Sequence, residues 1–149
     1  MIYMLLVITV LIGMLMPIQA SINAELTRIL QNPFLGAFIS FFMGSLALLI
    51  ICLIQGNFLI DLKRLTLASP YQFIGGFFGA LFVGSSIILI PKLGATTLMA
   101  AFVTGQLLMS LALDHYGWFG ITSQPISLQR VFGVILLFTG LLLIAKKAA

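Results

Sequence analysis

The chain has 149 residues, of which 62% are hydrophobic and only 7% are charged. Because a soluble domain carries about 25% charged residues, this composition excludes a water-exposed globular surface. The net charge of +4 comes from cations scattered between apolar runs, which lack the basic stripe of a nucleic-acid-binding module. We therefore expect an integral membrane protein.

Charged and turn residues divide the chain into apolar stretches that are long enough to cross a bilayer, which takes about 20 residues. They predict helices at residues 2–23, 34–54, 71–90, 95–113 and 130–145. The short connection at residues 91–94, which begins with Pro91, predicts that the third and fourth helices are antiparallel neighbours. We therefore predict an all-α membrane fold with a single five-helix domain over residues 1–149.

Aromatic residues provide a separate check on these boundaries, because Trp and Tyr prefer the headgroup level of a bilayer. Tyr3, Tyr71, Tyr116 and Trp118 all fall at predicted helix ends. Their positions favour the same division into five helices.

The basic residues give almost no preferred orientation. With the N-terminus outside, the inner cations are Arg28, Lys92, Lys146 and Lys147, and the outer ones are Lys63, Arg64 and Arg130. Four against three is nearly no bias under the positive-inside rule. This predicts dual topology and an antiparallel homodimer, which is the unfused form of an inverted repeat. The alternative is one fixed orientation set by a partner chain.

Polar residues follow a proline in the first predicted helix. Pro17 has no N–H to donate to the carbonyl of Gly13, so we expect a kink there. Gln19 and Asn23 follow at a spacing of four and hence lie on one helix face.

A second polar face lies on the fourth predicted helix, where Gln106, Ser110 and Asp114 repeat at a spacing of four. Polar side chains inside membrane spans usually face the protein interior or a hydrated cavity. We therefore expect the two polar faces to bind a substrate in a shared cavity. The alternative is that they only hydrogen-bond neighbouring helices.

Small residues mark the third predicted helix. Gly75 and Gly79 form a GxxxG pair, and Gly84 continues the small-residue spacing that begins at Ala80. Such faces let helices approach closely in lipid. We predict that Gly75, Gly79 and Gly84, with Pro17 and Pro91, are packing or hinge positions.

Signals of enzyme chemistry are weak. His115 lies beside Asp114, but no nucleophile or group of metal ligands accompanies the pair. The lone Cys52 forms neither an intrachain disulfide nor a thiol metal site. We therefore expect no catalysis, cofactor or metal, and we place Asp114, His115 and Trp118 at the mouth of the cavity.

Several short motifs form a recognisable pattern. They are Gln19-Ala20, Asn23, Gly75-Gly76, Gly79-Ala80, Pro91, Leu93-Gly94, Gly105-Gln106-Leu107, Ser110, Asp114-His115-Tyr116-Gly117, Gly120, Pro125, Arg130 and Gly133. Over nearly the whole chain this pattern resembles the YdcZ-type family of the drug/metabolite transporter superfamily. The resemblance implies a five-helix protomer that pairs head to tail, and it implies export of small molecules.

Together these expectations describe a secondary transporter in the cytoplasmic (inner) membrane. It exports a small organic solute by alternating access, and its partners are the lipid bilayer and a second copy of the chain. One alternative is a dual-topology ion channel, which predicts flux far above carrier rates. Another is a non-transporting membrane subunit, which predicts a stable complex with a different chain.

Overall fold

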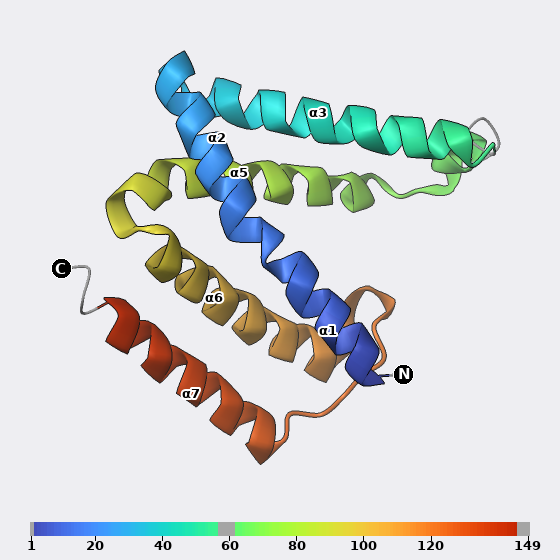
Figure 1. Cartoon of the computed structure of the whole chain (residues 1–149). Coiled ribbons are helices and arrows are strands. Elements are labelled where there is room, and N and C mark those ends of the chain that lie inside the picture. The colour runs from blue at the N-terminus through green and yellow to red at the C-terminus, as the bar shows by residue number, and fades with distance from the viewer. Residues whose placement is uncertain (1, 57–61, 146–149) are drawn as a thin grey trace. The chain divides into compact units, whose positions relative to one another are not determined.

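The computed structural model describes residues 2–56 and 62–145, and no strand occurs among them (Figure 1). The helical stretches long and apolar enough to cross a bilayer are Ile2–Leu30, Pro33–Ile54, Pro70–Leu93, Ala95–Tyr116 and Leu128–Ala145. The prediction of five spanning helices is therefore confirmed. The chain divides into two compact units, Met1–Ile88 and Leu89–Ala149, which are described separately.

The first span of the first unit is interrupted. Helix α1 (Ile2–Gly13) and helix α2 (Leu15–Leu30) are separated at Met14, as the blue ribbon in Figure 1 shows. The break lies just before Pro17, whose missing N–H leaves the carbonyl of Gly13 without its usual donor. Helix α2 extends past residue 23 to Leu30, so Glu25 and Arg28 are helical rather than in a loop.

A tight turn joins α2 to helix α3 (Pro33–Ile54). Gln31 adopts a left-handed conformation with φ 52° and ends α2. The side chain of Asn32 then caps α3 by accepting from the backbone N–H groups of Phe34 at 3.0 Å and Leu35 at 3.1 Å. Pro33 follows at the first helical position, where its missing N–H costs nothing.

Helices α2 and α3 are in close contact where Thr27 faces Gly36. A Cβ atom added to Gly36 would collide with the hydroxyl of Thr27, so this position has no room for a side chain. Ala20 and Asn23 on α2 and Ala37 on α3 are also buried. Small residues therefore make this helix pair possible, as expected where no hydrophobic effect drives association.

Helix α5 (Ile74–Leu93) follows two short 3-10 turns, Leu65–Leu67 and Pro70–Phe73. Of its predicted packing glycines, Gly79 lies against α3, where an added Cβ would be 3.5 Å from the ring of Phe41. Gly75 and Gly84 leave open space within 4 Å in the described part of the chain. Of these three, only Gly79 would bring an added Cβ within 4 Å of another helix in the described chain, although Gly84 is itself buried.

The connection expected at residues 91–94 is shorter in the structure. Helix α5 continues through Pro91 to Leu93, and Gly94 alone separates it from helix α6 (Ala95–Tyr116). Pro91 does not end the helix, because it removes only one backbone hydrogen bond in a final turn. Gly94 ends it instead, with φ 76° and ψ 157°, while its N–H still donates to Ile90 at 2.9 Å.

The second unit is an antiparallel hairpin of α6 and helix α7 (Leu128–Ala145), which lie side by side in Figure 1. Helix α6 runs past residue 113 and includes Asp114, His115 and Tyr116. Gly117 ends it in a left-handed conformation with φ 65°, and its N–H donates to Leu113 at 2.9 Å. Helix α7 begins at Leu128, two residues before the predicted start.

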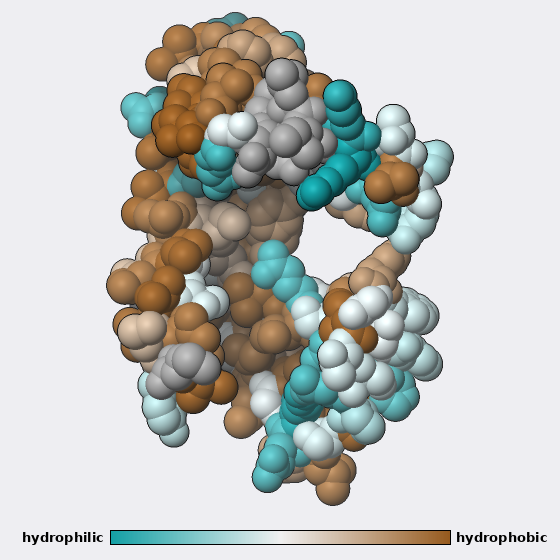
Figure 2. All heavy atoms as spheres, turned by 90° about the vertical axis from the view of Figure 1, so that its right-hand side faces the viewer, coloured by the Kyte–Doolittle hydropathy of each residue, from teal (hydrophilic) through white to brown (hydrophobic). Residues whose placement is uncertain are grey.

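Large apolar side chains are exposed along most of the helices. On the face shown in Figure 2, hydrophobic residues cover much of the surface and hydrophilic residues gather in separate patches. Such an exterior is unusual for a soluble monomer and fits contact with lipid. Lys146 and Lys147, which contribute to the count of basic residues, lie outside the described residues.

Candidate functional site

A network of polar contacts closes the end of the α6–α7 hairpin. Asp114 Oδ2 on α6 lies 3.2 Å from Arg130 Nη1 on α7. The second guanidinium nitrogen, Arg130 Nη2, donates to the side-chain oxygen of Gln124. The backbone N–H of Gln124 donates in turn to the carbonyl of Asp114 at 2.7 Å. Arg130 and Gln124 therefore join the end of α6 to the start of α7.

Each charge of the ion pair lies at the end of its helix where the helix dipole disfavours it. Asp114 lies in the last turn of α6 and Arg130 in the first turn of α7. A carboxylate at a helix C-terminus and a cation at an N-terminus each cost about 0.3–1 kcal/mol at low ionic strength. Both side chains are about one-third exposed, and exposed pairs contribute about 0–1 kcal/mol. The ion pair therefore adds little to the stability of either helix on its own.

A groove of about 260 Å³ leads away from this ion pair along the seam between α6 and α7. Ser110 and Asp114 line it from α6, and Arg130 and Gly133 line it from α7. Its other lining residues are Leu107, Leu111, Val134 and Leu137. The groove therefore has a charged end and an apolar body, an arrangement suited to an amphipathic organic solute.

His115 is held by the loop that follows α6. Its Nδ1 accepts from the backbone N–H of Ile126 over 3.4 Å, and its carbonyl accepts from the hydroxyl of Ser123 at 2.9 Å. A neutral imidazole with Nδ1 as acceptor carries its proton on Nε2. His115 therefore has Nδ1 engaged by the loop, and its Nε2–H can donate to a ligand.

Aromatic rings surround the same helix end. The ring of His115 meets Tyr116 edge-on at 4.9 Å between centroids, and Tyr116 stacks on Trp118 at 5.1 Å. Phe119, next in the chain, has a φ of 57°, which is uncommon for a bulky residue. These rings place Tyr116 and Trp118 together at one end of a membrane span, where such side chains prefer to lie.

The structure brings together only some of the predicted site residues. Ser110 and Asp114 line one groove, and His115 and Trp118 flank Tyr116 beside it. Gln106 is exposed on α6 but does not line this groove.

The other two predicted residues, Gln19 and Asn23, lie on α2 in the first unit. Gln19 is exposed, whereas Asn23 is only 5% exposed and its Nδ2 has no hydrogen-bond partner in the described chain. An unpaired buried amide costs about 1–3 kcal/mol, so a group that accepts from it would be favourable there.

Arg130 is the site residue that the sequence reasoning missed, because it counted there only as a topology charge and a motif position. A signal was nevertheless present. A single anion ends one predicted helix and a single cation begins the next, and antiparallel helices joined by one loop bring such residues together.

Among the described residues, no group of three or more His, Cys, Asp or Glu side chains is close enough to hold a metal ion. The polar chemistry of the hairpin end comes instead from Asp114, Arg130, His115 and Ser110. These groups can hydrogen-bond a solute and attract a charge. They offer no activated nucleophile.

The family described as inner membrane exporter, YdcZ, matches residues 4–143 of the chain. The match includes both helical units and every residue of the ion-pair groove. No curated protein and no solved structure matches the chain.

Proposed function

We propose that this chain, which belongs to the YdcZ family of inner membrane exporters, is a secondary transporter that moves a small organic solute out of the cell. The observation that carries the proposal is the α6–α7 groove between two membrane-spanning helices, which has an ion pair at one end and, apart from Ser110, an apolar lining beyond it. A solute with one polar group and an apolar body matches both parts of this groove.

The ion pair supplies a means of coupling in this proposal. Asp114 and Arg130 neutralise each other when no solute is present. A solute carrying a charged or strongly polar group competes for one partner and releases the other, which changes the contacts between α6 and α7. Differential contacts of this kind are what a ligand needs to shift a conformational equilibrium.

Further elements of the proposal rest on the sequence. Gln19, Asn23 and Gln106 are proposed substrate contacts, and the α5 surface at Gly75 and Gly79 is proposed to let helices rock during alternating access. The near-equal distribution of basic residues supports an antiparallel homodimer with dual topology.

Transport is tested in proteoliposomes that contain the purified full chain. A panel of small organic solutes is first screened for compounds that raise its melting temperature, and flux of those compounds is then measured. We expect saturable flux that falls at least tenfold in Asp114→Asn and several-fold in Ser110→Ala. Thr139→Val is the matched control, because the hydroxyl of Thr139 on α7 only bonds its own helix at Ile135.

Other results would contradict this function. Fast, unsaturable ion flux would indicate a channel. A chain that is inactive by itself and active only in a complex with a different chain would be a subunit. Normal flux in Asp114→Asn and Ser110→Ala would remove the groove from the site. Normal flux in Gln19→Ala and Gln106→Ala would remove those two contacts.

Dual topology is tested separately by labelling Thr122→Cys in a Cys52→Ser background. Thr122 is exposed in the loop between α6 and α7. Comparable labelling from both sides of sealed vesicles is expected. Labelling from one side only would exclude the antiparallel homodimer.

A further inference from the structure

The N-terminal end of α6 has free backbone donors. Gly94 precedes the helix and provides no side-chain cap, and the first helical bond of the turn runs from the N–H of Leu98 to Gly94 at 3.1 Å. The N–H groups of Ala95, Thr96 and Thr97 have no partner among the described residues. Such a helix end attracts anions, because its free N–H groups and its dipole both favour negative charge.

A buried side chain adds an independent observation at this end. Thr97 is only 8% exposed, and its hydroxyl makes no hydrogen bond within the described part of the chain. Thr104 of the same helix behaves in the usual way and donates to the carbonyl of Ala100 at 2.8 Å. The residue is largely enclosed and its hydroxyl has no partner in the described chain, so Thr97 can donate to a group bound at this helix end.

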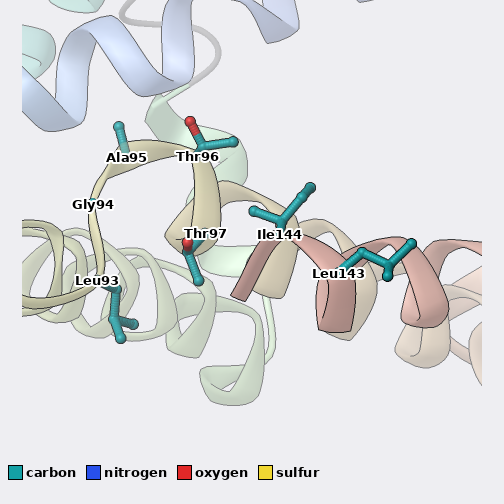
Figure 3. Close-up of a pocket in the computed structure, with 7 residues that line it drawn as sticks. All are labelled: Leu93, Gly94, Ala95, Thr96, Thr97, Leu143 and Ile144. Carbon is teal, nitrogen blue, oxygen red and sulfur yellow. The ribbon is translucent and has the colours of Figure 1, made fainter. Parts of the chain in front are cut away.

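Thr97 lines an open hollow of about 640 Å³ at this end of the hairpin. Figure 3 shows the first turn of α6 with the side chains of Thr96 and Thr97 on different sides of the helix, and with Leu143 and Ile144 contributed by α7. Leu93 completes the apolar part of the wall. The hollow thus joins polar donors to an apolar surface at the end of membrane-spanning helices.

The charges near this end favour an anion. Lys92 is exposed in the last turn of α5, two residues before Gly94. Asp114, the only carboxylate side chain in residues 89–149, lies in the last turn of the 22-residue α6. No carboxylate side chain in the described part of this unit therefore lies near the donors.

From these observations we propose that the N-terminus of α6 binds a phosphate group, with Thr97 as its side-chain donor. The ligand class is a phosphate ester, and the apolar wall suits the acyl chain of a phospholipid. This site lies at the opposite end of α6 from Asp114, so the inference does not depend on the proposed transport activity.

The test measures binding to the purified full chain in a neutral detergent, by native mass spectrometry and by thermal melting. The probes are phosphatidylglycerol, a diacylglycerol with the same acyl chains, and inorganic phosphate. Phosphatidylglycerol is expected to bind at least tenfold more tightly than diacylglycerol. Equal binding of the two would overturn the proposal, because the phosphate would then contribute nothing.

Inorganic phosphate identifies the source of the ligand. Stabilisation by millimolar phosphate, together with displacement of phosphatidylglycerol, would support the phosphate site and favour a soluble ligand. If phosphatidylglycerol stays bound in the presence of inorganic phosphate and diacylglycerol does not bind, the ligand is the phospholipid.

Two substitutions at one position locate the site. Thr97→Val removes the hydroxyl at nearly constant shape and is expected to weaken phosphatidylglycerol binding at least threefold. Thr97→Asp places a carboxylate where it suits the helix dipole but repels phosphate, so binding should fall more than tenfold. Thr104→Val is the matched control and should bind normally. Wild-type binding by both Thr97 variants would overturn the assignment.

Discussion

The two ends of α6 differ in whether their polar groups have partners within the described chain. At the C-terminal end, Asp114 is paired with Arg130, Gly117 caps the helix, and the following loop binds back through Gln124 and Ser123. At the N-terminal end, one glycine forms the whole connection, and the donors of the first turn are unpaired within the described chain.

This difference separates two roles within one helix. The C-terminal end is complete in itself, and a ligand there must compete with contacts that already exist. The N-terminal end is incomplete, and a ligand there adds contacts at no such cost. The first arrangement suits a site that must release its solute, whereas the second suits a ligand that stays bound.

The largest effect is expected at the paired end. Arg130→Ala leaves Asp114 without its partner and should lower transport at least tenfold. The free energy of unfolding should change by no more than about 1 kcal/mol, because the pair is partly exposed. The double variant with Asp114→Arg and Arg130→Asp should regain stability but not transport. Transport at the wild-type rate in either variant would show that the pair only joins the helices.

A smaller effect is expected at the one-residue connection. Gly94 has φ 76° and ψ 157°, a conformation that residues with a Cβ atom rarely adopt. Gly94→Ala should therefore reduce the free energy of unfolding by about 1–3 kcal/mol, although an added Cβ would meet nothing within 4 Å. Gly94→Asn should lose at least as much free energy of unfolding as Gly94→Ala, because this conformation is essentially restricted to glycine. Unfolding in a denaturing detergent titration measures both, and an unchanged Gly94→Ala midpoint would contradict the strain.

The matching substitution at the paired end should cost less and respond differently. Gly117→Ala places a Cβ 3.2 Å from the carbonyl oxygen of Ile121 in a left-handed residue, at a cost of about 1–2 kcal/mol. Asn tolerates this conformation, so Gly117→Asn should recover part of the loss, in contrast to Gly94→Asn. The same unfolding titration measures the difference between the two variants. If Gly117→Ala and Gly117→Asn lose the same free energy of unfolding, the contact of the Cβ atom decides the cost and not the backbone conformation.

The smallest effect concerns helix α3, whose N-terminus is capped where that of α6 is not. Asn32→Ala removes the acceptor for Phe34 and Leu35 and should cost about 1 kcal/mol. Asn32→Asp retains an acceptor and is the control. A loss well below this value would mean that lipid or water replaces the cap, and free donors at α6 would then need no ligand either.

The number of helices follows from the sequence, whereas several helix ends do not. Apolar runs mark where the chain lies in lipid, but a helix does not have to end at the first charge that follows such a run. Glu25 and Arg28 continue α2, and Asp114 continues α6, because a helix can extend into the headgroup region. Helices α2, α5 and α6 end where the backbone takes a positive φ, at Gln31, Gly94 and Gly117 respectively.

The candidate site was predictable in part. Spacing alone placed Ser110 and Asp114 on one face of a helix, and the structure places both in one groove. The contact with Arg130 depends on the path of the loop between α6 and α7, which turns at Phe119 and Gly120 with positive φ. Nothing in the hydrophobic pattern specifies such a turn for a phenylalanine. The free donors of α6 likewise depend on the conformation of Gly94.

The single glycine between α5 and α6 also bears on how the chain enters the membrane. A connection of one residue leaves no loop to carry the charges that set orientation, so the cation at this turn, Lys92, lies in the last turn of α5. The orientation signal between these two spans is therefore a single charge that belongs to a helix.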